Sequence, residues 1–178
     1  MAQKVIVIGA VSQNGVYGEG SEIPWKIPAD FKNFKELTTD WTVIMGRGTR
    51  ESLPPKYQPL PRRDNMVITN TPGYEAKDAK IFTSVEQAIA AARTEKVFCI
   101  GGVGIWYHAM YIADEAWVTV VKRSYPIHPG TTHYAPELIN PPSKWPSFSF
   151  DEMTVNKDVE GDIPGFSIVR WIRKKEQQ

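Results

Sequence analysis

The sequence predicts a single-domain α/β protein, with a mostly parallel central β-sheet flanked by helices and a C-terminal antiparallel hairpin. Three observations support this class. Short apolar runs rich in β-branched residues recur along the chain, as expected for strands covered on both faces. Segments with helical start signals separate these runs, and strict alternation of strand and helix favours a parallel sheet. The length of 178 residues and the lack of a Gly/Ser linker place residues 1–178 in one domain.

The predicted strands are the apolar runs bounded by polar or turn residues. They are residues 4–11, 42–45, 65–69, 97–100 and 116–121. The first run is too short to span a membrane, and a polar Ser12-Gln13-Asn14-Gly15 follows it, so a buried strand explains it better than a signal peptide. The tail from Phe148 onward partly alternates apolar and polar residues around a turn at 161–165, which predicts the hairpin.

Helix starts are marked by proline, serine and glycine. Pro28 suits a first helical turn, and Phe31, Phe34 and Leu37 give the following segment an apolar stripe. Ser84 opens a capping box with the glutamine three residues later, which predicts a helix through residue 92. Two further helices are predicted after glycine-rich breaks, a short one after 46–49 and a longer one over 104–111.

Composition excludes several classes of function. The chain has 21 basic and 20 acidic side chains, so it lacks the net positive field that nucleic-acid binding uses. Cys99 is the only cysteine, which rules out an intramolecular disulfide and favours a reducing, cytoplasmic compartment. It lies in an apolar run, where a buried structural thiol is expected. The histidines, His108, His128 and His133, show no metal-ligand spacing, so no metal site is predicted.

Two glycine junctions are candidates for binding a dinucleotide. Gly101-Gly102 follows a predicted strand and precedes a helix, so backbone can approach a pyrophosphate at the helix N–H groups. Gly46-Arg47-Gly48-Thr49 repeats this arrangement, and Arg47 suits a phosphate. The alternative is that each glycine only makes a tight turn. Neither segment completes a GxGxxG motif, which disfavours a standard Rossmann dehydrogenase.

Asp30 is the candidate buried acid. It falls in the first turn of its predicted helix, where an acid commonly complements the helix dipole. Its sequence neighbours include Trp25, Ile27 and Phe31, so an apolar setting that raises the pKa is the second interpretation. The residues alone leave both open.

Four stretches in order closely resemble dihydrofolate reductase: 18–30, with Pro24-Trp25 followed by Pro28-Ala29-Asp30, then 43–49, 59–63 and 100–102. The resemblance runs from about residue 4 to the C-terminal hairpin. The resemblance implies the fold of that family. It also implies a monomeric cytoplasmic enzyme that reduces 7,8-dihydrofolate to tetrahydrofolate with NADPH. Hydride would pass from nicotinamide C4 to pterin C6, with protonation at N5. Dihydrofolate would be the only partner, with no nucleic acid and no membrane.

The resemblance also implies substrate contacts. Asp30 would accept N–H bonds from the pterin 2-amino group and N3, with Thr119 beside it, and N5 would take its proton from water. Trp25 would hold an ordered water or simply pack. Arg63 would pair with the α-carboxylate of the glutamate tail, and Lys35 would add charge there. The remaining substrate contacts would be Ile8, Ala10, Phe31, Phe34, Leu53, Leu60, Ile100 and Trp106.

For the cofactor, the resemblance implies a loop over the nicotinamide, a pocket for the 2′-phosphate and glycines at the pyrophosphate. The loop is residues 16–22, and Arg47, Thr69 and Asn70 would receive the 2′-phosphate. The competing explanation for Arg47 is a solvated surface charge. The implied cofactor residues are Ala10, Val16, Tyr17, Gly18, Glu19, Gly20, Ser21, Glu22, Gly46, Arg47, Gly48, Thr49, Thr69, Asn70, Gly101, Gly102, Val103, Gly104 and Ile105.

Four positions depart from the family pattern. Arg50 replaces a common tryptophan and would either contact the cofactor or face water. Val103 replaces a third glycine, and Trp106 replaces a frequent tyrosine. Thr131 stands where an acid commonly precedes the threonine, which puts a latch between two loops in doubt.

Two rival functions remain open on the sequence. The first is the flavin-pathway reductase of the same fold, which acts on a ribosylaminopyrimidine and has no need of Arg63. The second is a non-catalytic folate- or nucleotide-binding module, in which the departures at Val103, Trp106 and Thr131 mark lost turnover.

Overall fold

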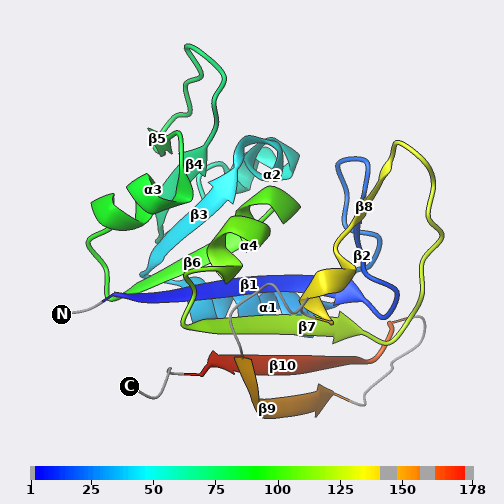
Figure 1. Cartoon of the computed structure of the whole chain (residues 1–178). Coiled ribbons are helices and arrows are strands. Elements are labelled where there is room, and N and C mark those ends of the chain that lie inside the picture. The colour runs from blue at the N-terminus through cyan, green and yellow to red at the C-terminus, as the bar shows by residue number, and fades with distance from the viewer. Residues whose placement is uncertain (1–2, 141–147, 157–162, 175–178) are drawn as a thin grey trace. The chain divides into compact units, whose positions relative to one another are not determined.

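The computed structural model describes residues 3–140, 148–156 and 163–174 (Figure 1). The chain forms two compact units: a first unit of Met1–Ile8 and Asn33–Asp114, and a second unit of Gly9–Lys32 and Glu115–Gln178. Strand β1 (Lys4–Ser12) and helix α1 (Pro28–Thr38) each begin in one unit and end in the other. That residues 1–178 act as one domain stays a prediction.

The first unit contains the parallel part of the sheet. Its strands lie in the order β5-β4-β3-β6-β1, and every adjacent pair is parallel. They are β3 (Thr42–Gly46), β4 (Asp64–Ile68), β5 (Lys80–Phe82) and β6 (Lys96–Gly101) beside β1. The helices are α2 (Arg47–Ser52), α3 (Val85–Ala91) and α4 (Val103–Met110), with a 3₁₀ turn η1 (Pro55–Tyr57). Parallel strands beside β6 are visible in Figure 1.

The core of this unit explains the uninterrupted apolar runs. Val7, Val43, Ile44 and Val97 are fully buried, so the central strands have no solvated face, and α4 packs against two of these strands, β3 and β6. Cys99 is also fully buried, and burial raises the pKa of its thiol to about 12. The prediction of a structural thiol is therefore confirmed, since a thiol with so high a pKa is a poor nucleophile.

The second unit contains the antiparallel part. Its strand order is β1-β7-β10-β9, with β7 (Glu115–Val121), β10 (Phe166–Arg173) and β9 (Phe148–Asn156). β10 runs antiparallel to both neighbours, which confirms the predicted hairpin. Part of its predicted turn, 161–162, lies outside the described residues. The eight strands form one mixed, mostly parallel sheet, as predicted.

Three short strands and two 3₁₀ turns, η1 and η2, were not predicted. β2 (Val16–Glu19) pairs with β8 (Thr132–Tyr134) in a separate two-stranded sheet, β5 extends the main sheet by three residues, and η2 (Pro136–Leu138) follows β8. Strands of three or four residues are too short for a periodic pattern to develop.

Two helix predictions need correction. The Ser84 hydroxyl accepts a hydrogen bond from the Gln87 N–H at 3.2 Å, as a cap should, but the Gln87 side chain bonds Thr83 rather than Ser84. Half of the predicted capping box is thus absent. The expectation that Phe31 belongs to a packed stripe of α1 is also wrong, since its side chain is 46% exposed.

No helix in the part of the chain that is described is long and apolar enough to cross a membrane.

Candidate active site

Asp30 and Thr119 form a hydrogen-bonded pair in the second unit. Asp30 lies in the first turn of α1, and Thr119 is a buried residue of β7. The Thr119 hydroxyl donates to Asp30 Oδ1 at 2.6 Å. Burial raises the pKa of Asp30, and the hydrogen bond from Thr119 offsets part of that rise. A carboxylate that only complemented the helix dipole would have a lowered pKa, so the apolar setting decides its chemistry.

Phe31 adds an exposed aromatic face next to this acid. Its side chain is 46% exposed although it follows Asp30 directly on α1. An exposed large apolar side chain beside a half-buried carboxyl suits a flat ligand that carries N–H donors at one edge. The two residues offer a hydrogen-bond acceptor and an exposed apolar side chain at successive positions of α1.

Trp25 is a packing residue in this structure. It is 5% exposed and belongs to a buried cluster with Ile27, Val121 and Phe166, against which Ala10 also packs. Its role in holding a water stays a prediction.

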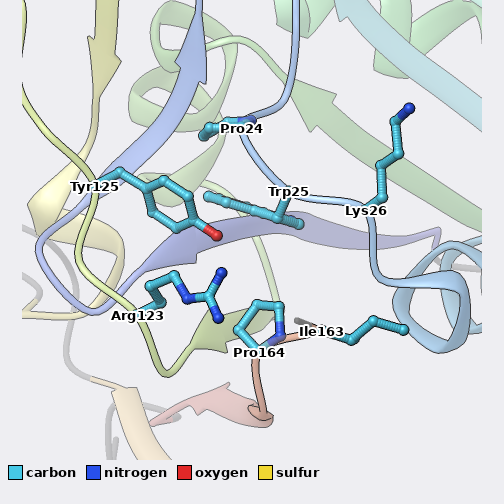
Figure 2. Close-up of a pocket in the computed structure, with 7 residues that line it drawn as sticks. All are labelled: Pro24, Trp25, Lys26, Arg123, Tyr125, Ile163 and Pro164. Carbon is cyan, nitrogen blue, oxygen red and sulfur yellow. The ribbon is translucent and has the colours of Figure 1, made fainter. Parts of the chain in front are cut away.

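A hollow of about 300 Å³ lies beside Trp25 in the second unit (Figure 2). The rings of Trp25 and Tyr125 are 5.4 Å apart and tilted by 47°. Figure 2 shows the Arg123 guanidinium directed toward Trp25, whereas the Lys26 ammonium points away. The remaining lining residues are Pro24, Ile163 and Pro164. Of the predicted site residues only Trp25 lines this hollow, so it does not coincide with the predicted substrate contacts.

The two predicted glycine junctions lie side by side in the first unit. A Cβ added at Gly46 would stand 3.8 Å from the Gly102 nitrogen and 3.9 Å from the Gly101 oxygen. Met45 of β3 is the register partner of Gly101 in β6, which brings the two junctions together. Gly101 has φ +119°, and a Cβ there would meet Trp106 at 3.0 Å, so this position requires glycine.

The N-terminus of α4 has the form of an anion-binding site. Its N-cap, Gly102, provides no side-chain hydrogen bond, and a Cβ at Gly104 would meet no atom within 4 Å. Backbone N–H groups in such open space can approach a phosphate. Arg47 opens α2 with its side chain 47% exposed and 3.9 Å from Glu51. Thr69 is half-buried, whereas Asn70 is exposed.

Arg63 is held in place by backbone and hydroxyl oxygens. Its Nε and Nη2 atoms donate to the Thr38 hydroxyl at 3.1 Å, Nη2 also donates to the Lys35 carbonyl, and Nη1 donates to the Pro61 carbonyl at 2.7 Å. Burial lowers the pKa of Arg63 from its usual value. One Nη1 N–H is left for a ligand, so a two-bond grip on a carboxylate requires Nη2 to release one acceptor. Sequence reasoning missed Thr38, because its partner is 25 residues away.

Two residues that depart from the family pattern, Arg50 and Trp106, are buried and hydrogen-bonded within the protein, and their contacts with cofactor or substrate stay predictions. Arg50 is 8% exposed and donates to Gln58 and to the Lys77 carbonyl, so the expectation that it could face water is wrong. Trp106 is 4% exposed, and its indole N–H donates to the Ile8 carbonyl at 3.0 Å. Val103 is the first residue of α4.

The loop that was expected over the nicotinamide is bonded to the segment 128–134 in the second unit. Glu19 accepts hydrogen bonds from Thr131 and Thr132, and the Gly20 N–H donates to the Thr131 carbonyl at 2.8 Å. The doubt about a latch is resolved: the two segments are joined although Thr131 is not an acid.

The other predicted residues take the following positions. Ile8 and Leu60 are buried, Phe34, Leu53 and Ile100 are half-buried, and Lys35 is exposed, all in the first unit. In the loop, Val16 and Gly18 are buried, Tyr17 is half-buried, and Ser21 and Glu22 are exposed. Gly48 is exposed, Thr49 is half-buried and Ile105 is buried. Among the described residues, no group of three His, Cys, Asp or Glu side chains is arranged to hold a metal.

The chain is similar to one family throughout most of its length. The family model for dihydrofolate reductase matches residues 4–162. The dihydrofolate reductase of Neisseria gonorrhoeae is 42% identical over 122 residues, covering 68% of this chain and 74% of the relative. That of Mycobacterium leprae is 38% identical over 133 residues, covering 74% and 80%.

The same likeness holds in three dimensions. A solved structure of dihydrofolate reductase from Enterococcus faecalis, complexed with NADP(H) and RAB-propyl, superposes with a TM-score of 0.79 at 26% identity and covers 97% of each chain.

Proposed function

The chain belongs to the dihydrofolate reductase family, and on this premise we propose that it reduces 7,8-dihydrofolate to 5,6,7,8-tetrahydrofolate with NADPH. The observation that carries the proposal is the Asp30–Thr119 pair beside the exposed Phe31. It provides a carboxyl group of raised pKa in an apolar setting, at the position the family motif assigns to the pterin.

Asp30 binds and orients the substrate ring. Its carboxylate accepts N–H bonds from the pterin 2-amino group and N3, and these bonds compensate the burial that raises its pKa. Thr119 donates to Oδ1, which fixes the plane of the carboxylate, and Oδ1 keeps a second lone pair so that both oxygens can accept from the ligand. N5 is protonated from water, with Asp30 acting on the ring through its charge. Phe31 and the half-buried Phe34 provide apolar contact.

The first unit fits NADPH. The adjoining glycine junctions at Gly46 and Gly101 leave backbone N–H groups open at the start of α4, which suits a pyrophosphate. Arg47, with Thr69 and Asn70, provides cationic and polar groups for a 2′-phosphate. When bound, NADPH supplies the hydride that C6 of the pterin receives.

Arg63 and Lys35 bind the glutamate tail of the substrate. Thr38 and the Lys35 and Pro61 carbonyls hold the guanidinium in one orientation, so little side-chain entropy is lost when a carboxylate binds. Dihydrofolate is the partner. We further propose that the enzyme acts as a cytoplasmic monomer without nucleic acid, which the single cysteine and the balanced charge support.

The test of the function is NADPH oxidation by the purified protein with and without dihydrofolate, with NADH in a parallel reaction. We expect oxidation that depends on dihydrofolate and prefers NADPH, because Arg47 has no counter-charge to bind in NADH. Oxidation that appears only with a ribosylaminopyrimidine would instead support the flavin-pathway rival. Binding of both ligands without oxidation would support the binding-module rival.

Arg63→Ala separates the folate reductase from its flavin-pathway rival. We expect the KM for dihydrofolate to rise about 10- to 100-fold with a small change in kcat, because bonds from a charged donor to the tail carboxylate are lost. The matched control is Arg62→Ala, whose side chain is 72% exposed and pairs with Asp40. Equal KM values for dihydrofolate in the two variants would show that Arg63 does not bind the substrate.

A further inference from the structure

Arg50 is a buried cation in the first unit. It lies in α2 three residues after Arg47 and is 8% exposed. None of the ion pairs among the described residues includes Arg50. Its Nε N–H is also buried, and no acceptor for it lies in the part of the chain that the structure describes. An apolar side chain of similar size would avoid the cost of burying a charge and an unsatisfied N–H, so packing alone does not account for an arginine at this position.

The two terminal nitrogens of Arg50 donate to two different segments. Nη1 donates to Gln58 Oε1 at 3.0 Å, and Nη2 donates to the Lys77 carbonyl at 3.2 Å. Gln58 directly follows η1, and its side-chain amide donates to the Leu53 carbonyl, just after the end of α2. Because Gln58 is itself bonded to this end of α2, it fixes one side of the guanidinium, and the other side is free to hold Lys77.

Lys77 belongs to the segment 69–79, which joins β4 to β5 (Figure 1). Most residues of this segment are exposed. Its backbone makes two short turns, in which the Tyr74 N–H donates to the Thr71 carbonyl and the Ala79 N–H to the Ala76 carbonyl, both at 3.3 Å. These bonds lie within the segment. The hydrogen bond from Arg50 connects it to α2.

The two elements that Arg50 connects carry the groups proposed to receive the 2′-phosphate. Arg47 begins α2, and Thr69 and Asn70 begin the segment 69–79. The Arg47 side chain is 47% exposed and lies 3.9 Å from Glu51, so water and an acid both weaken its attraction for an anion. A ligand binds more tightly when the groups that receive it are held in place beforehand. The connection between α2 and the segment therefore bears on phosphate binding.

We propose that Arg50 is a positioning residue that holds the segment 69–79 against α2 and thereby fixes the pocket for the 2′-phosphate of NADPH. This rests on the proposed function. The tryptophan that is common in the family at this position has one N–H donor, whereas Arg50 donates to two segments at once. Its guanidinium acts through the segment and not on the phosphate, because its side chain is buried.

Arg50→Met tests this connection, because it keeps an apolar stem and removes both donors. In the protein without ligand, we expect amide hydrogen exchange to be faster in 69–79 and unchanged in β3 and β6. The Kd for NADPH, measured by tryptophan fluorescence, should rise about three- to tenfold, as the loss of hydrogen bonds from a charged donor predicts. The Kd for NADH should stay unchanged, because NADH lacks the 2′-phosphate. Arg93→Met removes an exposed arginine outside the site and is the matched control, with wild-type exchange and binding expected.

Arg50→Lys separates position from charge. It keeps the charge but replaces the planar fork by one ammonium group, so it should show most of the same losses. Wild-type exchange in 69–79 in both variants would overturn the proposal, and so would an equal loss of affinity for NADPH and NADH. Wild-type NADPH binding in Arg50→Lys, with weak binding in Arg50→Met, would assign the effect to charge and overturn the positioning role. A wild-type protein that binds neither nucleotide refutes the proposed function instead, while exchange still decides whether Arg50 holds the segment.

Discussion

Asp30→Asn is expected to lower turnover of dihydrofolate about 10²- to 10⁴-fold at pH 7 without unfolding the protein. The amide keeps an acceptor for Thr119, whose hydroxyl donates to Asp30 Oδ1 at 2.6 Å, so the local packing survives. It loses the negative charge and one of the two acceptors that a pterin N–H pair needs. Steady-state NADPH oxidation across pH measures the effect.

Although Asp30→Asn should lower turnover, it should not lower the stability of the fold at pH 7. Burial raises the pKa of Asp30, so the folded state binds more protons than the unfolded state between the ordinary and the raised value. The wild type therefore loses stability as pH rises through that window, and the asparagine variant, which has no charge to bury, does not. Thermal melts at several pH values measure this effect. At pH 7 the Tm of the Asp30→Asn protein should equal or exceed that of the wild type.

Asp114→Asn is the matched control for Asp30. Asp114 accepts from the Val5 N–H at 2.8 Å, an interaction that an amide oxygen preserves, and it is exposed. This variant should keep full turnover. Wild-type rates in Asp30→Asn, with an unchanged pH profile, would exclude Asp30 from the reaction.

Glu115→Ala is expected to destabilise the fold by about 3 kcal/mol, because it removes a buried carboxylate that accepts two hydrogen bonds from a partly buried guanidinium. Glu115 is 3% exposed at the start of β7, and Arg170 of β10 donates to it through Nη2 at 2.7 Å and Nε at 3.0 Å. The Trp117 indole N–H also donates to it at 2.8 Å, and the guanidinium lies 5.1 Å over that ring. Removing the carboxylate takes away the acceptor of these three hydrogen bonds in the strand pair that carries Thr119.

Urea denaturation measures this loss against an exposed ion pair. Lys80→Met removes the partner of Asp64 at 2.8 Å, where the side chains are 53% and 28% exposed, and should cost about 0–1 kcal/mol. The double variant Glu115→Leu/Arg170→Met should recover much of the stability, because it removes both charges. A loss in Glu115→Ala no larger than in Lys80→Met would show that solvent already screens the pair.

The long elements could be predicted from the sequence because their signals are local. The buried runs of β3 and β6 and the proline at the start of α1 each lie within a few residues of the structure they specify. The strands β2, β5 and β8 were missed because each has only three or four residues. Pairing with a distant strand, not the local pattern, makes them strands.

Parts of the candidate site were predicted in the same local way. The glycines at 46 and 101 and the acid at Asp30 belong to short motifs whose residues are adjacent in the chain. The environment of Arg50 was not predictable: its acceptors are Gln58 and Lys77, and no rule of spacing distinguishes a buried arginine from a solvated one. Glu19 accepts hydrogen bonds from Thr131 and Thr132, which lie 112 and 113 positions away, so the sequence showed only that Thr131 was unusual.

The alternation of strand and helix, the glycine junctions, the family resemblance and the candidate acid could all be inferred from the amino-acid order, since these depend on side-chain type and near neighbours. The protonation, burial and hydrogen bonding of those side chains could be found only from the folded chain. Burial raises the pKa of Asp30, and hydrogen bonds lower the pKa of Glu19. Trp106 and Arg50 are buried and donate hydrogen bonds within the protein. The physical reason is that burial and hydrogen bonding depend on which distant segments surround a group, and charge responds to both.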